Sequence, residues 1–116
     1  MKKVLLVEDD PGIGEIVTLI LAKEGYAVHL HTTGFLVPEL VKDYDPDLVL
    51  LDIGLPGKSG TTICNELKQI SNRPPIVLFS AQTNMVAANK LCKADGFIGK
   101  PFDIKSFVET LHTYIN

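Results

Sequence analysis

The sequence lacks long apolar runs, and this excludes several classes of protein. Polar residues such as Thr18, Asp47 and Ser80 interrupt its apolar stretches well before the about 18 residues that a membrane-spanning helix needs. At the N-terminus the apolar run Val4–Val7 ends at Glu8, which is too soon for the core of a signal peptide. We therefore expect a protein with neither a membrane span nor a secretory leader.

Cysteine and excess positive charge are also scarce. The two cysteines, Cys64 and Cys92, form neither a CxxC motif nor part of a cysteine and histidine pattern typical of zinc. We expect buried, reduced thiols, which fit a cytoplasmic location. Lys and Arg number 11 against 14 Asp and Glu, and the net charge of -3 argues against a protein that binds nucleic acid directly or coats an anionic membrane.

Apolar content is high enough for one well-packed domain. Of the 116 residues 46% are hydrophobic, which is incompatible with a disordered chain and sufficient for a core without metal or disulfide support. Apolar runs of strand length alternate repeatedly with segments of helical periodicity, the pattern of βαβ units. The sequence therefore predicts an α/β fold in which a parallel sheet is covered by helices.

Capping and turn residues indicate where these elements begin and end. Asp10 and Pro11 suit the start of the first helix, and Gly25 suits its end. The apolar face of that helix consists of Ile13, Ile16, Val17, Ile20 and Leu21. The predicted strands are Val4–Val7, Tyr26–His31, Asp47–Asp52, Ile76–Phe79 and Gly96–Gly99. The other predicted helices are Phe35–Asp43, a helix that begins near Ser59, Met85–Lys93 and Ile104–Ile115.

Polar side chains follow the inner strands at the points where they end. The first run leads into Glu8 and Asp9, the third ends at Asp52, the fourth leads into Ser80 and the fifth into Lys100. Parallel strands end at one edge of their sheet, where ligands bind, so we expect these side chains to share one rim. Each of them taken singly has a plainer interpretation as a cap, turn or surface residue. Their positions after consecutive inner strands favour a site.

The predicted rim combines three carboxylates with a hydroxyl and an ammonium group. Clustered carboxylates raise one another's pKa unless a cation lies among them, and oxygen ligands in a hydrated site suit Mg²⁺. Asp52 is the best-placed nucleophile, because a carboxylate can attack phosphorus and form an acyl phosphate. Lys100 could pair with the phosphoryl group, and the Ser80 hydroxyl could donate to it.

The motifs that carry this rim are Leu5–Asp10, Pro46–Asp52, Leu55–Gly57, Ser80–Ala81 and Lys100–Phe102. Each is weak alone, but in their order and spacing they closely resemble the receiver domain of two-component response regulators. The resemblance covers essentially the whole chain. It implies a single receiver domain over residues 1–116, with a doubly wound, flavodoxin-like sheet of five parallel strands in the order 2-1-3-4-5 and helices on both faces.

The resemblance also implies a role for the acidic residues. Asp52 would take a phosphoryl group from a phosphohistidine on a histidine kinase or a histidine phosphotransfer protein. The domain would catalyse its own phosphorylation and dephosphorylation rather than act as a conventional enzyme. Asp9, Asp52 and the backbone carbonyl of Gly54 would bind Mg²⁺, with Glu8 acting through a metal-bound water.

A switch is implied on the neighbouring strands. Lys100 and Ser80 would contact the phosphoryl oxygens, and the Lys100–Pro101 peptide would be cis. The Ser80 hydroxyl would swing toward the acyl phosphate while Phe97, on the fifth strand, turns inward behind it. The surface around the fourth helix, fifth strand and fifth helix would then exist in two states.

The resemblance also implies partners for the domain, and other functions compete with it. The implied partners are the upstream phosphodonor protein and a downstream effector, or an output domain that does not follow Asn116, with no direct contact to nucleic acid or membrane. One alternative is a pseudo-receiver that binds proteins without being phosphorylated. An aspartate-based phosphatase of the haloacid dehalogenase type is disfavoured, because it needs a second acid where this chain has Gly54. A flavin carrier is disfavoured because the acidic segment Glu8–Asp10 would repel a phosphate.

Overall fold

The computed structural model describes residues 1–55, 58–81, 92–100 and 102–115. Within these ranges five parallel strands form one sheet in the order β2-β1-β3-β4-β5. The strands are β1 (Lys3–Val7), β2 (Ala27–His31), β3 (Leu48–Asp52), β4 (Ile76–Ala81) and β5 (Gly96–Lys100). The helices are α1 (Pro11–Lys23), α2 (Val37–Tyr44), α3 (Gly60–Leu67) and α5 (Ile104–Ile115). The predicted fold class and strand order are confirmed.

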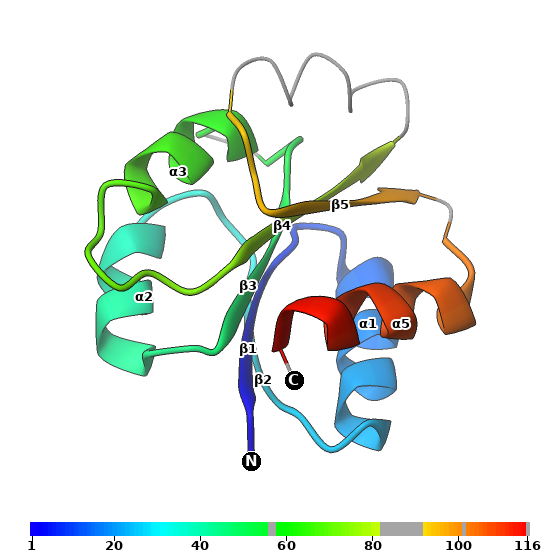
Figure 1. Ribbon diagram of the computed structural model, residues 1–116. Coiled ribbons are helices and arrows are strands. Elements are labelled where there is room, and N and C mark those ends of the chain that lie inside the picture. The colour runs from blue at the N-terminus through cyan, green and yellow to red at the C-terminus, as the bar shows by residue number, and fades with distance from the viewer. Residues whose placement is uncertain (56–57, 82–91, 101, 116) are drawn as a thin grey trace.

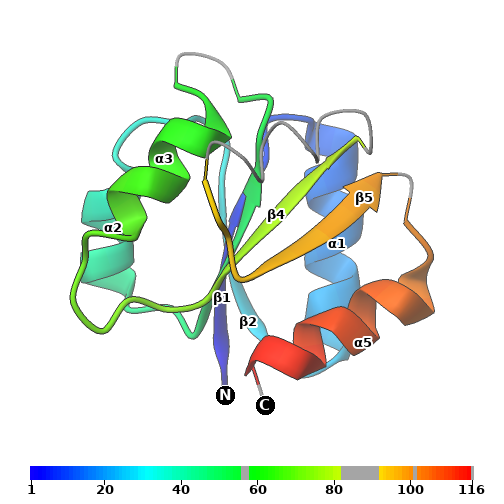
Figure 2. The ribbon, with the colours of Figure 1, turned by 45° about the horizontal axis from the view of Figure 1, so that its top comes forward.

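The sheet is covered by helices on both faces. Helices α1 and α5 lie on one side of it, and α2 and α3 lie on the other (Figure 1 and Figure 2). Successive residues of a strand point to opposite faces, so Leu5 and Val7 join the apolar core beneath α2 and α3, whereas Val4 and Leu6 join the core beneath α1 and α5. Burial on both faces explains why β1 and β3 read as continuous apolar runs.

Capping residues define both ends of helix α1, which follows β1. The Asp10 carboxylate accepts hydrogen bonds from the backbone N–H groups of Gly12 and Ile13, at 2.9 and 3.1 Å. Pro11 occupies the first turn, and Gly25 follows the helix with a φ of 88°, a left-handed conformation that glycine adopts without strain. The predicted caps are confirmed. The N-cap Asp10 starts α1 three residues after β1 ends, beside the acidic residues Glu8 and Asp9.

Some predicted core positions and boundaries differ from the structure. Ile16 is 54% exposed and Ile104 is 58% exposed, so neither belongs to the buried face of its helix. Helix α2 begins at Val37 rather than at the predicted Phe35, because Leu36 takes a left-handed φ of 64° that a helix cannot include. The predicted helix Met85–Lys93 falls mainly outside the described residues. No helix within those residues has the length and apolar content to span a bilayer.

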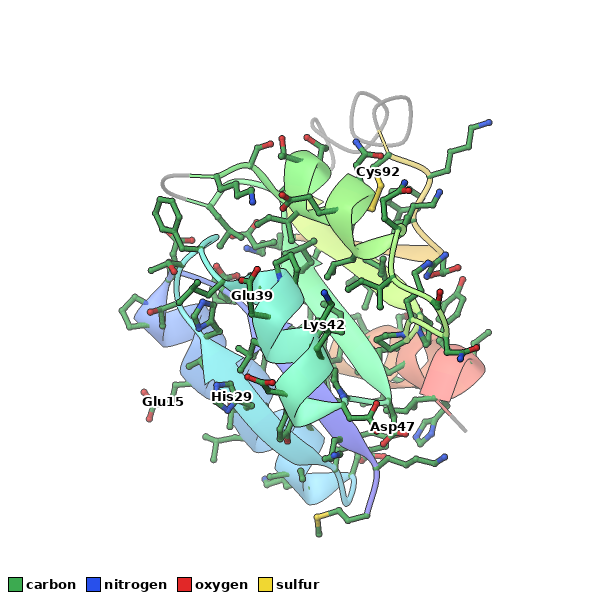
Figure 3. The ribbon with its side chains drawn as sticks, turned by 90° about the vertical axis from the view of Figure 1, so that its left-hand side faces the viewer. Glu15, His29, Glu39, Lys42, Asp47 and Cys92 are labelled. Carbon is green, nitrogen blue, oxygen red and sulfur yellow. A yellow bond between two sulfur atoms is a disulfide. The ribbon has the colours of Figure 1, made fainter. Side chains whose placement is uncertain are left out.

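The two cysteines correct a further prediction. Both are buried as expected, but Cys64 of α3 and Cys92 form a disulfide instead of staying reduced (Figure 3). The fold brings their Cα atoms to 6.2 Å, although 28 residues separate them in the sequence. No spacing pattern in the sequence predicts this disulfide, because the tertiary fold and not the local sequence brings the two cysteines together.

Candidate acidic site at the carboxyl edge of the sheet

The carboxyl ends of β1 and β3 bring three acidic side chains together. Val7 of β1 pairs with Leu51 of β3, so the residues that follow them, Glu8 and Asp52, emerge side by side. Glu8, Asp9 and Asp52 can each offer one carboxylate oxygen, and these three oxygens lie within 4.8 Å of one another. We call this set the acidic triad. The predicted convergence of these residues is therefore present in the structure.

Glu8 is the most deeply buried member of the triad. It is 1% exposed, and its carboxylate accepts hydrogen bonds from the Asp10 N–H at 3.2 Å and from Lys100 Nζ at 2.6 Å. Burial, reinforced by the adjacent Asp52 carboxylate, raises the pKa of Glu8 to about 7, although the two donors oppose that rise. The triad therefore holds more negative charge than its own surroundings neutralise.

Lys100, at the end of β5, reaches across β4 to the triad. Its ammonium group lies 2.6 Å from Glu8 Oε1 and 3.5 Å from Asp52 Oδ2, so it pairs with two of the three acids. The same group lies 4.6 Å from the centre of the Phe79 ring, a cation–π contact. Phe79 had no predicted role. Its place in the sequence could have indicated one, because Phe79 is the last apolar residue of the fourth predicted strand and pairs with Asp52 in the sheet.

Asp52 is held by the turn that follows β3. The Gly54 N–H donates to Asp52 Oδ1 at 3.2 Å, and Asp52 is only 6% exposed. Gly60 begins α3 directly against the Asp52 carbonyl, where any Cβ would collide with backbone. Among the described residues, a Cβ at Gly54 would meet no atom within 4 Å. The position of the Gly54 carbonyl as a metal ligand stays a prediction.

The donor chemistry of the triad fits a divalent cation. All the candidate ligand atoms are carboxylate oxygens, which hard cations prefer, and the exposed Asp9 leaves one side accessible to solvent. The triad has two buried carboxylates and one exposed carboxylate, and a single lysine pairs with it. This leaves a local excess of negative charge that a cation would neutralise. In the part of the chain that the structure describes, no other group of His, Cys, Asp and Glu has this proximity.

The remaining predicted residues are placed only in part. The backbone of Ser80 pairs with that of Gly99, which sets Ser80 beside β5, but its side chain lies outside what is described. Phe97 pairs with Leu78 and packs, partly buried, against the core beneath α2 and α3. Pro101 is outside the described residues, so the geometry of the Lys100–Pro101 peptide stays a prediction.

Comparison with known proteins identifies the family. Residues 4–112 match the model of the response regulator receiver domain. The chain belongs to that family.

Relatives at the level of sequence and structure agree. The chain is 36% identical over 109 residues to the DNA-binding response regulator MtrA of Mycolicibacterium smegmatis, and the match covers 92% of this chain and 47% of that protein. The receiver domain thus spans about half the length of this relative.

Two solved structures superpose over nearly the full chain. The BeF₃-activated N-terminal receiver domain of Klebsiella pneumoniae RstA matches with a TM-score of 0.89 and 31% identity, covering 99% of both chains. A response regulator from Chloroflexus aurantiacus matches with a TM-score of 0.91 and 27% identity, covering 98% of this chain and 97% of that one. The strand order and helix placement are therefore those of a receiver domain.

Proposed function

We propose that this receiver domain accepts a phosphoryl group on Asp52 from a phosphohistidine, with Mg²⁺ held by the acidic triad. The carrying observation is the convergence of Glu8, Asp9, Asp52 and Lys100 at one edge of the sheet. The phosphodonor is a histidine kinase or a histidine phosphotransfer protein, and the site of action is the cytoplasm. Downstream, the domain acts on an effector protein or on an output domain of a longer regulator such as its DNA-binding relative.

The residues divide the work of phosphoryl transfer. One Asp52 carboxylate oxygen attacks phosphorus, the phosphorus–nitrogen bond to the donor imidazole breaks, and an acyl phosphate forms. The Gly54 N–H holds Asp52 Oδ1 at 3.2 Å, which orients the carboxylate and leaves its other oxygen, Oδ2, toward Lys100. Lys100 is within reach to neutralise the transferring oxygens by exchanging its contact with Asp52 for one with the phosphoryl group.

The metal site is assigned to the triad together with the Gly54 carbonyl. Asp9 and Asp52 would be direct ligands, and Glu8 would act through a bound water. When bound, Mg²⁺ supplies charge neutralisation for the phosphoryl oxygens. Glu8 meanwhile holds the Lys100 ammonium at 2.6 Å, so this buried carboxylate also positions the lysine.

The proposed switch uses β4 and β5. The Ser80 hydroxyl would move to the acyl phosphate, and Phe97 would fill the space behind it. Support comes from the register of the adjacent strands β4 and β5. In it Ser80 pairs with Gly99, and Phe97 pairs with Leu78. Phe97 carries no hydroxyl, so its change of position is a packing event.

A phosphatase mechanism finds no support at this site. An aspartate phosphatase needs a second acid near its nucleophile, and the residue two positions after Asp52 is Gly54, whose N–H bonds to the nucleophile. The unphosphorylated pseudo-receiver is an outcome of the test below.

The test is covalent labelling with a small phosphodonor. In Mg²⁺ and acetyl phosphate the wild-type protein should gain one phosphoryl group that is stable to acid and labile to base, seen as a mass increase of the intact chain. Asp52→Asn should gain none, because its amide is not a nucleophile. Asp47→Asn is the matched control, since Asp47 lies near the other end of β3 and should leave labelling unchanged. Full labelling of Asp52→Asn would contradict the assignment, and an unlabelled wild type would establish the pseudo-receiver.

A further inference from the structure

The Cys64–Cys92 disulfide links helix α3 to the segment before strand β5, and both elements have residues next to the acidic site. Cys64 lies in α3, the helix that begins against the backbone of Asp52, and Cys92 precedes β5, the strand that carries Phe97 and Lys100. Figure 3 shows Cys92 at this bond, beside α3. The chain between the two cysteines contains β4 and Ser80.

The fold holds this pair ready for oxidation. The Cα atoms are 6.2 Å apart, which is within the range that a disulfide spans without backbone movement. Cys64 is 0% and Cys92 is 2% exposed, so each sulfur has the other as its reaction partner inside an apolar core. Burial makes reaction with reagents in solution depend on local opening, while closure between the two sulfurs needs none.

A disulfide has a particular meaning in the compartment proposed for this domain. Glutathione and thioredoxin keep cytoplasmic thiols reduced, and disulfides that form there are usually transient and redox-responsive. The pair is thus expected to exchange between dithiol and disulfide, and not to serve as a permanent staple.

The crosslink lies where the proposed switch must move. Cys92 and Phe97 pack against the same apolar core beneath α2 and α3, together with Leu78 of β4. Between Cys92 and β5, the Asp95 N–H donates to the Ile76 carbonyl at 2.9 Å, so this segment is tied to the start of β4. A covalent bond from Cys92 to α3 adds a second anchor, and any rearrangement of β5 relative to α3 becomes more costly.

We propose that Cys64 and Cys92 are a reversible redox pair whose oxidation weakens the response of the receiver to phosphorylation. The second half of this proposal rests on the phosphoacceptor function proposed above. A low-molecular-weight disulfide is the oxidant: one cysteine thiolate attacks it and releases one thiol, and the second cysteine attacks the resulting mixed disulfide and releases the other. Two electrons pass from the cysteines to the oxidant, and excess thiol reverses the reaction.

The first arm of the test is a thiol count. The native protein is equilibrated over a range of ratios of reduced to oxidised glutathione, then denatured, alkylated and weighed. A shift from two alkylated cysteines to none as oxidised glutathione increases is expected. Two alkylated cysteines at every ratio would overturn the proposal.

The second arm measures coupling with Mg²⁺ and beryllofluoride, a phosphoryl mimic. The oxidised protein should bind beryllofluoride about fivefold or more weakly than the reduced protein, and by reciprocity beryllofluoride should favour the dithiol by the same factor. Equal affinities of the two forms would overturn the coupling. The comparison needs no substitution, and the Cys64→Ala/Cys92→Ala variant should show one affinity at all glutathione ratios.

The experiments distinguish failure of the phosphoacceptor proposal from failure of the redox coupling. If neither redox form binds beryllofluoride and neither is phosphorylated, the phosphoacceptor function falls, and the coupling falls with it. If both forms are phosphorylated but respond alike, the coupling alone falls.

Discussion

Acidic side chains lie at both ends of the sheet, and their surroundings differ. At the amino end, Asp47 accepts the backbone N–H of Lys3 at 2.7 Å, and Asp95 accepts the N–H of Ile76 at 2.8 Å and an Arg73 guanidinium N–H at 2.8 Å. Each carboxylate there ties two strands together and has its own donors. At the carboxyl end, three carboxylates crowd within 4.8 Å, and Lys100 pairs with two of them.

The pKa shifts express the same difference. Burial alone would raise the pKa of Asp95, but hydrogen bonds from Arg73 and Ile76 outweigh it and hold that pKa below the ordinary 3.8. Burial and Asp52 raise the pKa of Glu8 to about 7 despite its own donors. Asp95 at the amino end is therefore stabilised as an anion and serves the fold. Glu8 at the carboxyl end is instead destabilised as an anion in the metal-free protein, and a bound cation would compensate for this.

Removing an acid from each end should separate binding from stability. Asp9→Asn should weaken Mg²⁺ binding about a hundredfold, because it removes an anionic ligand from an oxygen-only site. Asp47→Asn should leave the affinity unchanged. Calorimetric titration of both variants makes the measurement. Equal affinities in the two variants would mean that the cation binds elsewhere.

The pH dependence of stability should reverse in sign between the two ends, and Glu8 gives the larger effect. Its pKa in the folded, metal-free protein is raised from 4.5 to about 7, so its stabilising contribution is present in acid and is lost as the pH rises toward 7. Glu8→Gln should remove a fall of about 2 kcal/mol in the free energy of unfolding between about pH 5 and pH 8. Urea unfolding in the presence of a chelator measures this; an unchanged pH profile would refute the assigned burial.

Asp95 should behave in the opposite sense. Its pKa lies below 3.8 in the folded state, so its stabilising contribution is present at neutral pH and is lost as the pH falls through that lowered value. Asp95→Asn should lower the free energy of unfolding by about 1 kcal/mol at neutral pH, because it removes a partly exposed ion pair with Arg73. The difference from wild type should vanish in strong acid. A difference that grows on acidification would contradict this account.

The smallest effect on metal binding is expected at Lys100. Lys100→Ala should leave Mg²⁺ affinity intact or tighten it by about threefold, because a competing cation leaves the triad. The same variant should uncouple phosphorylation from any change in the amide resonances of α5. Lys3→Ala is the control, since Lys3 donates to the Tyr44 carbonyl at the other end of the sheet. Markedly weaker Mg²⁺ binding in Lys100→Ala would argue against its role as phosphoryl partner.

The sequence was sufficient to predict that Glu8, Asp9 and Asp52 converge, because the ends of buried strands can be recognised in it. Continuous apolar runs identify the buried strands, and in a parallel sheet the residues after them must meet at one edge, as Glu8 and Asp52 do. It could not predict which acid Lys100 would contact most closely, since that depends on how far a flexible side chain reaches across β4.

Features made by tertiary proximity were also beyond the sequence. The periodicity that places Ile16 in an apolar face cannot show which residues of that face the fold covers, and Ile16 is exposed. The pairing of Cys64 with Cys92 depends on the approach of α3 to the segment before β5, which no local pattern encodes. The acids of the amino end, Asp47 and Asp95, differ from the triad in their spacing and in the donors that the fold supplies.

The most direct test of the account is a crystal structure with Mg²⁺ and beryllofluoride. We predict a cation bounded by Glu8, Asp9 and Asp52, beryllofluoride on an Asp52 oxygen, and Lys100 Nζ moved from its 3.5 Å contact with Asp52 Oδ2 to the fluorine atoms. A cation bound away from the triad, or beryllofluoride attached to any residue other than Asp52, would contradict the central claim.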